Sequence, residues 1–169
     1  RINIFGKTLT DEIIQNSGLE LKEFTELAYF TKYDLYKHDS DKTIPTVRTY
    51  LLKNYLQKNL AELQDYYVGE RVVKELQQAG YINVQVVKDG INFKDGVIEI
   101  FRTYDYLNQR LNIIEKHTSR QYVFFISESY YALVFMNDTE ADKCFDEYAK
   151  LRTEIIRYSK SLSSTKSIN

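Results

Sequence analysis

Two nearly continuous apolar runs lie close together in the second half of the chain, at residues 120–126 (RQYVFFI) and 130–136 (YYALVFM). Ser127, Glu128 and Ser129 separate them. Short runs of aromatic and β-branched residues on both sides of a polar turn predict two strands joined as a hairpin. Because almost every position is apolar, rather than every second one, we expect both faces of these strands to be covered.

Outward from this hairpin, the C-terminal part of the chain mixes strand and helix patterns. Asp-Gly pairs at 89–90 and 95–96 separate β-rich runs, which is a strong hairpin signal. Apolar residues at helical spacing predict three helices, the first ending at Gly80. We therefore expect an α-βββ-α-ββ-α domain with an antiparallel sheet over residues 66–169. Its predicted helices are 66–79, 104–116 and 139–160, and its predicted strands are 82–87, 91–93, 97–101, 120–126 and 130–136.

The first 65 residues carry helix start and stop signals instead. Thr10 and Thr31 are suitable N-caps, Gly18 is a typical C-terminal stop, and Pro45 suits the first turn of a helix. These signals predict an all-α, five-helix N-terminal domain over residues 1–65, so the expected fold class is α+β with two domains. The predicted helices are 10–18, 21–28, 32–39, 45–56 and 60–67.

The segment 18–38 (GLELKEFTELAYFTKYDLYKH) has the pattern of a helix-turn-helix. Phe24 and Leu35 would face inward, while Lys32, Tyr33 and Lys37 would lie on a polar face that fits a DNA major groove. This segment resembles the Cro/repressor-type (XRE-like) helix-turn-helix family. The resemblance extends through Pro45 to Leu63 and covers none of the C-terminal domain.

The resemblance implies sequence-specific binding to double-stranded DNA. Carried over by position, Lys32, Tyr33 and Lys37 would contact bases, and Thr31, Lys42 and Thr46 would contact phosphates. Proteins of this type usually bind the two halves of an inverted-repeat operator as homodimers. The expected function is thus a transcriptional repressor or autoregulator of a phage or another mobile element.

Charge is compatible with such a role only locally. The whole chain carries a formal net charge of −1, which argues against indiscriminate binding to polyanions. Between residues 31 and 58, however, six basic residues stand against three acidic ones, a local net of +3. Several phosphate contacts from this segment would make DNA binding strongly dependent on salt.

Tyrosines in the C-terminal domain predict a protein interface, because tyrosine is enriched where proteins meet. The candidates are Tyr104, Tyr106, Tyr130 and Tyr131. The first hypothesis is that this interface forms a homodimer. The second hypothesis is similarity to two-domain phage anti-CRISPR proteins, which the run 73–84 (VKELQQAGYINV) loosely resembles; this similarity implies a Cas9-type nuclease as protein partner and an autorepressing N-terminal domain. The third hypothesis is a plasmid replication or partition regulator.

Catalysis and metal binding are not expected. One cysteine (Cys144) and two histidines (His38 and His117) provide neither a disulfide nor the usual zinc ligands. No glycine-rich phosphate loop and no nucleophile beside a base occur in the sequence. We therefore expect no enzyme activity, no cofactor and no metal. The absence of a long apolar run predicts no membrane span, and the single cysteine favours a cytoplasmic location.

Overall fold

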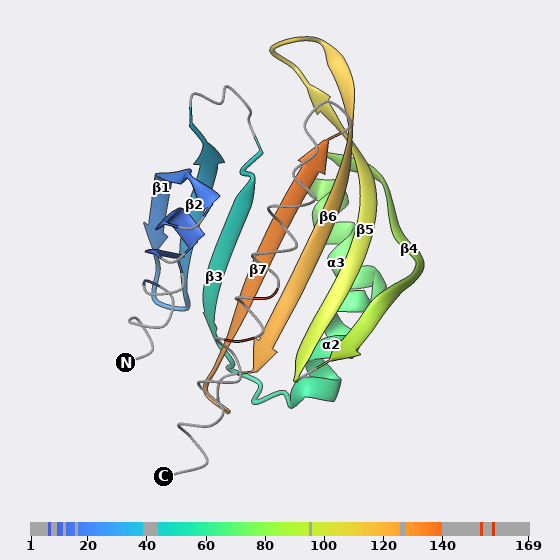
Figure 1. Cartoon of the computed structure of the whole chain (residues 1–169). Coiled ribbons are helices and arrows are strands. Elements are labelled where there is room, and N and C mark those ends of the chain that lie inside the picture. Colours follow the sequence, from blue (N-terminus) through green and yellow to red (C-terminus); the bar gives the residue numbers. More distant parts are fainter. Residues whose placement is uncertain are drawn as a thin grey trace.

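A computed structural model describes residues 7, 10–11, 13–15, 17–38, 44–94, 96–125, 128–139, 153 and 157. Its centre is a seven-stranded sheet with the strand order β1-β2-β3-β7-β6-β5-β4 (Figure 1). All neighbouring strands are antiparallel. Strands from the two ends of the chain meet in the middle, where Val47 of β3 pairs with Met136 of β7.

The predicted helix-turn-helix domain is wrong, because its segments are strands. The strands are β1 (Leu19–Glu26), β2 (Phe30–Lys37) and β3 (Val47–Lys53). The described residues between 7 and 17 are helical, as expected for the segment ending at Gly18. The five-helix bundle thus gives way to a three-stranded meander that completes the sheet of the C-terminal half. Both faces of β2 are covered, because Asp34 and Leu35 point to opposite sides of the strand and each is fully buried.

Two helices and four long strands make up the rest of the described fold. Helix α2 (Leu60–Val68) begins at a capping box in which Asn59 and Glu62 satisfy each other's backbone N–H groups. Helix α3 (Glu70–Gln78) follows after Gly69. The strands are β4 (Tyr81–Lys94), β5 (Val97–Asn108), β6 (Ile113–Phe125) and β7 (Tyr130–Thr139). The predicted strands 120–126 and 130–136 correspond to β6 and β7.

Three further predictions in this half need correction or lie outside the description. Residues 104–116, predicted as a helix, form the end of β5, a turn and the start of β6, which together project beyond the sheet (Figure 1). Asp89-Gly90 is an irregularity within β4 instead of a hairpin turn, because the register shifts between Val86 and Ile91. The predicted helix 139–160 lies almost entirely outside the described residues.

Each face of the sheet carries its own core. Helices α2 and α3 cover one face through Leu63, Tyr67 and Val72, which pack on Ile98, Ile100, Val123 and Leu133. On the opposite face, Ile13 and Leu19 belong to a cluster with residues of five strands, including Leu35, Val47 and Tyr122. The strands therefore need apolar residues on both sides. Within the described residues, no helix combines the length and apolar character needed to cross a membrane.

Candidate functional site

The residues predicted to bind DNA do not lie on one helical face. Thr31, Lys32, Tyr33 and Lys37 all belong to β2, where alternation places Lys32 on the opposite side from the other three. Lys32 Nζ lies 3.6 Å from the Asp34 carboxylate. Thr46 is buried just before β3, and Lys42 lies outside the described residues.

The four tyrosines predicted as an interface are spread over three environments. Tyr104 is buried, and its hydroxyl group donates to Asn137 Oδ1 at 2.6 Å. Tyr106 is half-buried and contacts the ring of Tyr81. Tyr130 and Tyr131 are half-buried at the start of β7, and the Tyr131 hydroxyl lies 2.9 Å from that of Tyr67. Of the four, only Tyr104 lines the pocket described next.

A pocket of about 310 Å³ lies between α3 and the helix-covered face of the sheet. Strand alternation builds its floor, because every second residue of a strand points to the same face. The walls are mainly apolar and aromatic: Leu76 and Val72 come from α3, and Tyr50, Leu133 and Phe135 come from the central strands. Tyr50 and Phe135 contact edge to face, with ring centroids 6.1 Å apart. A pocket of this size and lining is typical of small-molecule sites.

Polar side chains are buried in the same pocket. Arg102 of β5 is 2% exposed and Gln121 of β6 is 0% exposed. The Arg102 guanidinium donates to Gln121 Oε1 and to the backbone carbonyl oxygen of Tyr67. Arg102 Nε and Gln121 Nε2 have no acceptor within the described part of the chain. Burial lowers the pKa of Arg102 to about 10, so the group is still a cation at neutral pH.

A second arginine in the pocket wall is already neutralised. Arg48 of β3 donates from Nε and Nη2 to the two carboxylate oxygens of Asp34, at 2.6 and 3.0 Å. Burial lowers the pKa of Arg48, but the hydrogen bonds and charge of Asp34 outweigh it and leave the pKa above its ordinary value. Burial also raises the pKa of Tyr50, Tyr81 and Tyr104, which keeps these hydroxyl groups neutral.

Asn137 of β7 fixes one side of the pocket. Its Oδ1 accepts from the Tyr104 hydroxyl, and its Nδ2 donates to the carbonyl oxygen of Pro45 at 3.0 Å. Its backbone N–H donates to the carbonyl oxygen of Thr46 at 2.8 Å. These three bonds hold the segment before β3 against β5 and β7, so the rim at Ile44 and Pro45 is positioned by the sheet.

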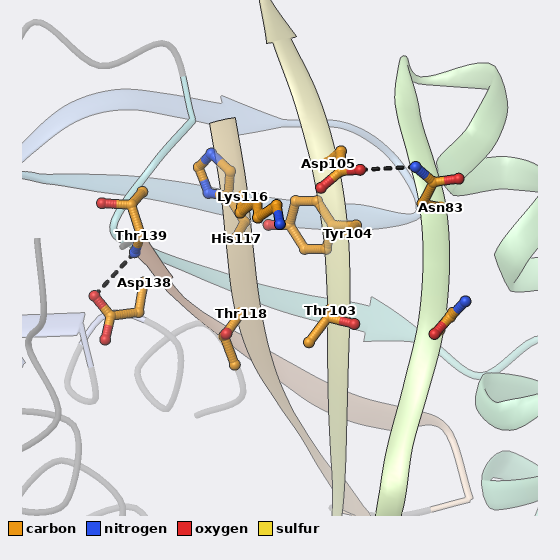
Figure 2. Close-up of a pocket in the computed structure, with 10 residues that line it drawn as sticks. Asn83, Thr103, Tyr104, Asp105, Lys116, His117, Thr118, Asp138 and Thr139 are labelled. Atoms are coloured by element: carbon orange, nitrogen blue, oxygen red, sulfur yellow. Dashed lines mark hydrogen bonds between the residues drawn. The ribbon is translucent and has the colours of Figure 1, made fainter. Parts of the chain in front are cut away.

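A larger hollow of about 550 Å³ is lined by residues near the start of β4 and β6 and near the end of β5 and β7 (Figure 2). Thr103, Thr118 and Asp138 of its wall pair directly across three strands, and Asp105 pairs with Lys116. Asn83 Nδ2 donates to Asp105 Oδ2 at 2.7 Å, as Figure 2 shows. Acidic and basic side chains are mixed here. The chain leaves the described residues directly after Thr139, which also lines this hollow. The smaller pocket is the candidate site, because it combines mainly apolar walls with buried hydrogen-bond donors that lack an acceptor in the described chain.

The described residues contain no group of three or more His, Cys, Asp or Glu side chains that could hold a metal ion. Comparisons with protein-family models, with curated proteins and with solved structures find no match for the chain. The function must therefore be argued from the pocket alone.

Arg102 and Gln121 are not among the residues predicted from the sequence, although the sequence holds a signal for Arg102. Residues 98, 100, 102 and 104 are Ile, Ile, Arg and Tyr, so one arginine interrupts an apolar face at strand spacing. A charge at such a position is rarely buried without a reason. Because the predicted strand ends at residue 101 and a helix is predicted over 104–116, Arg102 falls outside the predicted strand.

Proposed function

We propose that the protein binds a small organic molecule in the pocket between α3 and the sheet. The observation that carries the proposal is the pocket itself: about 310 Å³, with mainly apolar and aromatic walls and buried polar groups on its floor. Small-molecule sites usually combine an apolar lining with a few polar groups that fix the orientation of the ligand. The role would be that of a ligand sensor or carrier.

Calorimetry with small uncharged compounds, such as 1-octanol and 4-methylbenzyl alcohol, tests this function. Saturable binding should disappear in Ala79→Trp, because Ala79 lines the pocket at the end of α3 and a large ring there fills it. Gln78→Trp is the matched control, since Gln78 is exposed, as Ala79 is, but does not line the pocket. Equal binding by both variants, or absence of saturable binding of both uncharged and charged compounds of this size to the wild-type chain, would refute the proposal.

The DNA-binding regulator expected from the sequence depended on a recognition helix. Because that segment is strand β2, we do not carry this function forward. The anti-CRISPR and plasmid-regulator readings, the homodimer, the absence of enzyme activity and the cytoplasmic location stay predictions.

A further inference from the structure

The two unpaired donors of the pocket belong to side chains that contact each other. Arg102 and Gln121 stand diagonally across β5 and β6, since Arg102 pairs with Ser119 and Gln121 with Ile100. The hydrogen bond from the Arg102 guanidinium to Gln121 Oε1 joins the two side chains and fixes their orientation. Because the oxygen of the Gln121 amide accepts this bond, the atom of the amide that stays unpaired is the nitrogen, which is a donor. Arg102 Nε and Gln121 Nε2 are therefore two buried N–H groups on side chains that are hydrogen-bonded to each other, and each lacks an acceptor in the described chain.

Buried donors without acceptors are costly. A buried polar group normally has a hydrogen-bond partner, and leaving one unpaired destabilises the folded state. Tyr67 supplies only a backbone carbonyl oxygen, which satisfies one edge of the guanidinium without cancelling its charge. An acceptor that reaches both donors would remove this cost.

The charge balance of the pocket shows what kind of acceptor fits. Arg48 is neutralised by Asp34, whereas no carboxylate among the described residues pairs with Arg102. Glu75 of α3 also lines the pocket, but its side chain is 55% exposed and lies 3.7 Å from Arg71. One buried positive charge thus remains without a counter-charge. A single negative charge complements it, whereas a dianion would leave one charge buried and unpaired.

We propose that the ligand is a monocarboxylate with an apolar body, whose carboxylate oxygens accept from Arg102 Nε and Gln121 Nε2. This inference depends on the proposed function, because it names the ligand class of the same pocket. The apolar body lies along Leu76, Leu133 and Phe135. At the ~30 Å³ that a liquid water takes, the pocket has room for roughly ten non-hydrogen atoms, the size of a medium-chain or single-ring acid.

Three probes on the full chain separate the head-group chemistries by isothermal titration calorimetry: octanoate, 1-octanol and octyl phosphate. Octanoate should bind at least about 30-fold tighter than octanol, as expected for hydrogen bonds to charged groups. Octyl phosphate should bind more weakly than octanoate. Equal affinities for octanoate and octanol would overturn the inference and keep the proposed function. Tighter binding of octyl phosphate would overturn the choice of a monoanion. Failure of all three probes would refute both.

Gln121→Glu is the decisive variant. It keeps the shape of the side chain but places a carboxylate beside Arg102, so the protein itself supplies the missing counter-charge. Octanoate should then bind no more tightly than octanol, and an unchanged circular dichroism spectrum and melting temperature would show that the fold is intact. Gln109→Glu, at an exposed position outside the pocket, is the charge-matched control and should leave octanoate affinity unchanged. Unaltered octanoate binding by Gln121→Glu would overturn the assignment.

Arg102→Met provides a second test that also removes the positive charge. It should reduce octanoate binding to the octanol level in a protein whose circular dichroism spectrum matches that of the wild type. If this variant fails to fold, Gln121→Glu still decides the question, because it keeps the shape of the side chain and the oxygen that accepts from Arg102. Full octanoate affinity in a folded Arg102→Met protein would contradict the proposed contact.

Discussion

Asp34 and Arg48 face each other across β2 and β3 and form a two-pronged salt bridge, with N–O distances of 2.6 and 3.0 Å. The Asp34 side chain is 0% exposed, whereas that of Arg48 is 28% exposed. Lys32 Nζ, 3.6 Å away, is the second cation near this carboxylate. Arg48 lines the pocket beside α3, and the salt bridge joins β3 to β2, the segment that the sequence suggested to be a recognition helix.

Removing one partner of this salt bridge should be strongly destabilising. Arg48→Met leaves the Asp34 carboxylate buried with only Lys32 near it, and breaking a buried pair in this way costs about 3–5 kcal/mol. The double variant Asp34→Leu/Arg48→Met removes both charges and should recover most of that loss. Urea unfolding of the three proteins measures the difference. A single variant within about 0.5 kcal/mol of wild type would show that water reaches the carboxylate.

The Asn137 side chain should matter for the rim of the pocket as well as for stability. Asn137→Ala removes the acceptor of the Tyr104 hydroxyl and the donor to the Pro45 carbonyl oxygen. We expect a loss of about 1–3 kcal/mol and faster hydrogen exchange at Val47, the first residue of β3. Tyr104→Phe removes only one of the two bonds and should cost about 1 kcal/mol. Equal exchange at Val47 in wild type and Asn137→Ala would mean that the segment is held by other contacts.

The sequence was sufficient where local signals and tertiary structure agree. The runs 120–126 and 130–136 are strands, and helices α2 and α3 fall on the predicted helical segments 60–67 and 66–79. Gly80, with a φ of +98°, ends the helical part as its position suggested. In these segments the pattern of apolar residues is compatible with only one kind of element.

The sequence failed where pairing is distant or the turn residue is unusual. Strand β3 is stabilised by β7, whose paired residues lie 77 to 89 positions later in the chain, and no local pattern contains this partner. The turn of the β5–β6 hairpin uses Asn112 at a φ of +54°, and Asn108 Oδ1 accepts from the Leu111 N–H. Without glycine at that turn, the helical spacing of Tyr104, Leu107, Leu111 and Ile114 was the stronger local signal. The pocket joins five strands and two helices, so its residues could not be brought together without the fold.

Gly90 should tolerate no side chain, because β5 approaches it closely. A Cβ atom at this position would lie 2.7 Å from the Val87 carbonyl oxygen and 2.9 Å from Phe101 Cβ. Gly90→Ala should therefore displace the irregular part of β4 and destabilise the protein by about 1–3 kcal/mol. Gln85→Ala, at an exposed position on the same strand, should change stability by less than about 0.5 kcal/mol. Thermal unfolding of both variants checks the difference, and equal melting temperatures would contradict this close approach.

Stability should fall steeply above pH 10, because several tyrosines ionise only after unfolding. Burial raises the pKa of Tyr67, Tyr81 and Tyr104 above the ordinary value of 10.0. Their contribution is therefore complete below pH 10 and is lost as the pH rises through the folded-state pKa values. Arg102 acts in the opposite direction, since its pKa falls from 12.5 to about 10 on folding, but it is one group against several tyrosines.

Each such tyrosine adds about 1.4 kcal/mol per pH unit to the decline between pH 10 and its folded-state pKa. Tyr81→Phe should make the decline shallower by that amount. Tyr55→Phe is the control for loss of a tyrosine hydroxyl group, because the Tyr55 side chain is 68% exposed. Urea unfolding at a series of alkaline pH values, followed together with tyrosinate absorbance, gives both the slope and the number of ionised rings. Tyrosinate absorbance that rises fully before the protein unfolds would show that water reaches the pocket tyrosines in the native state.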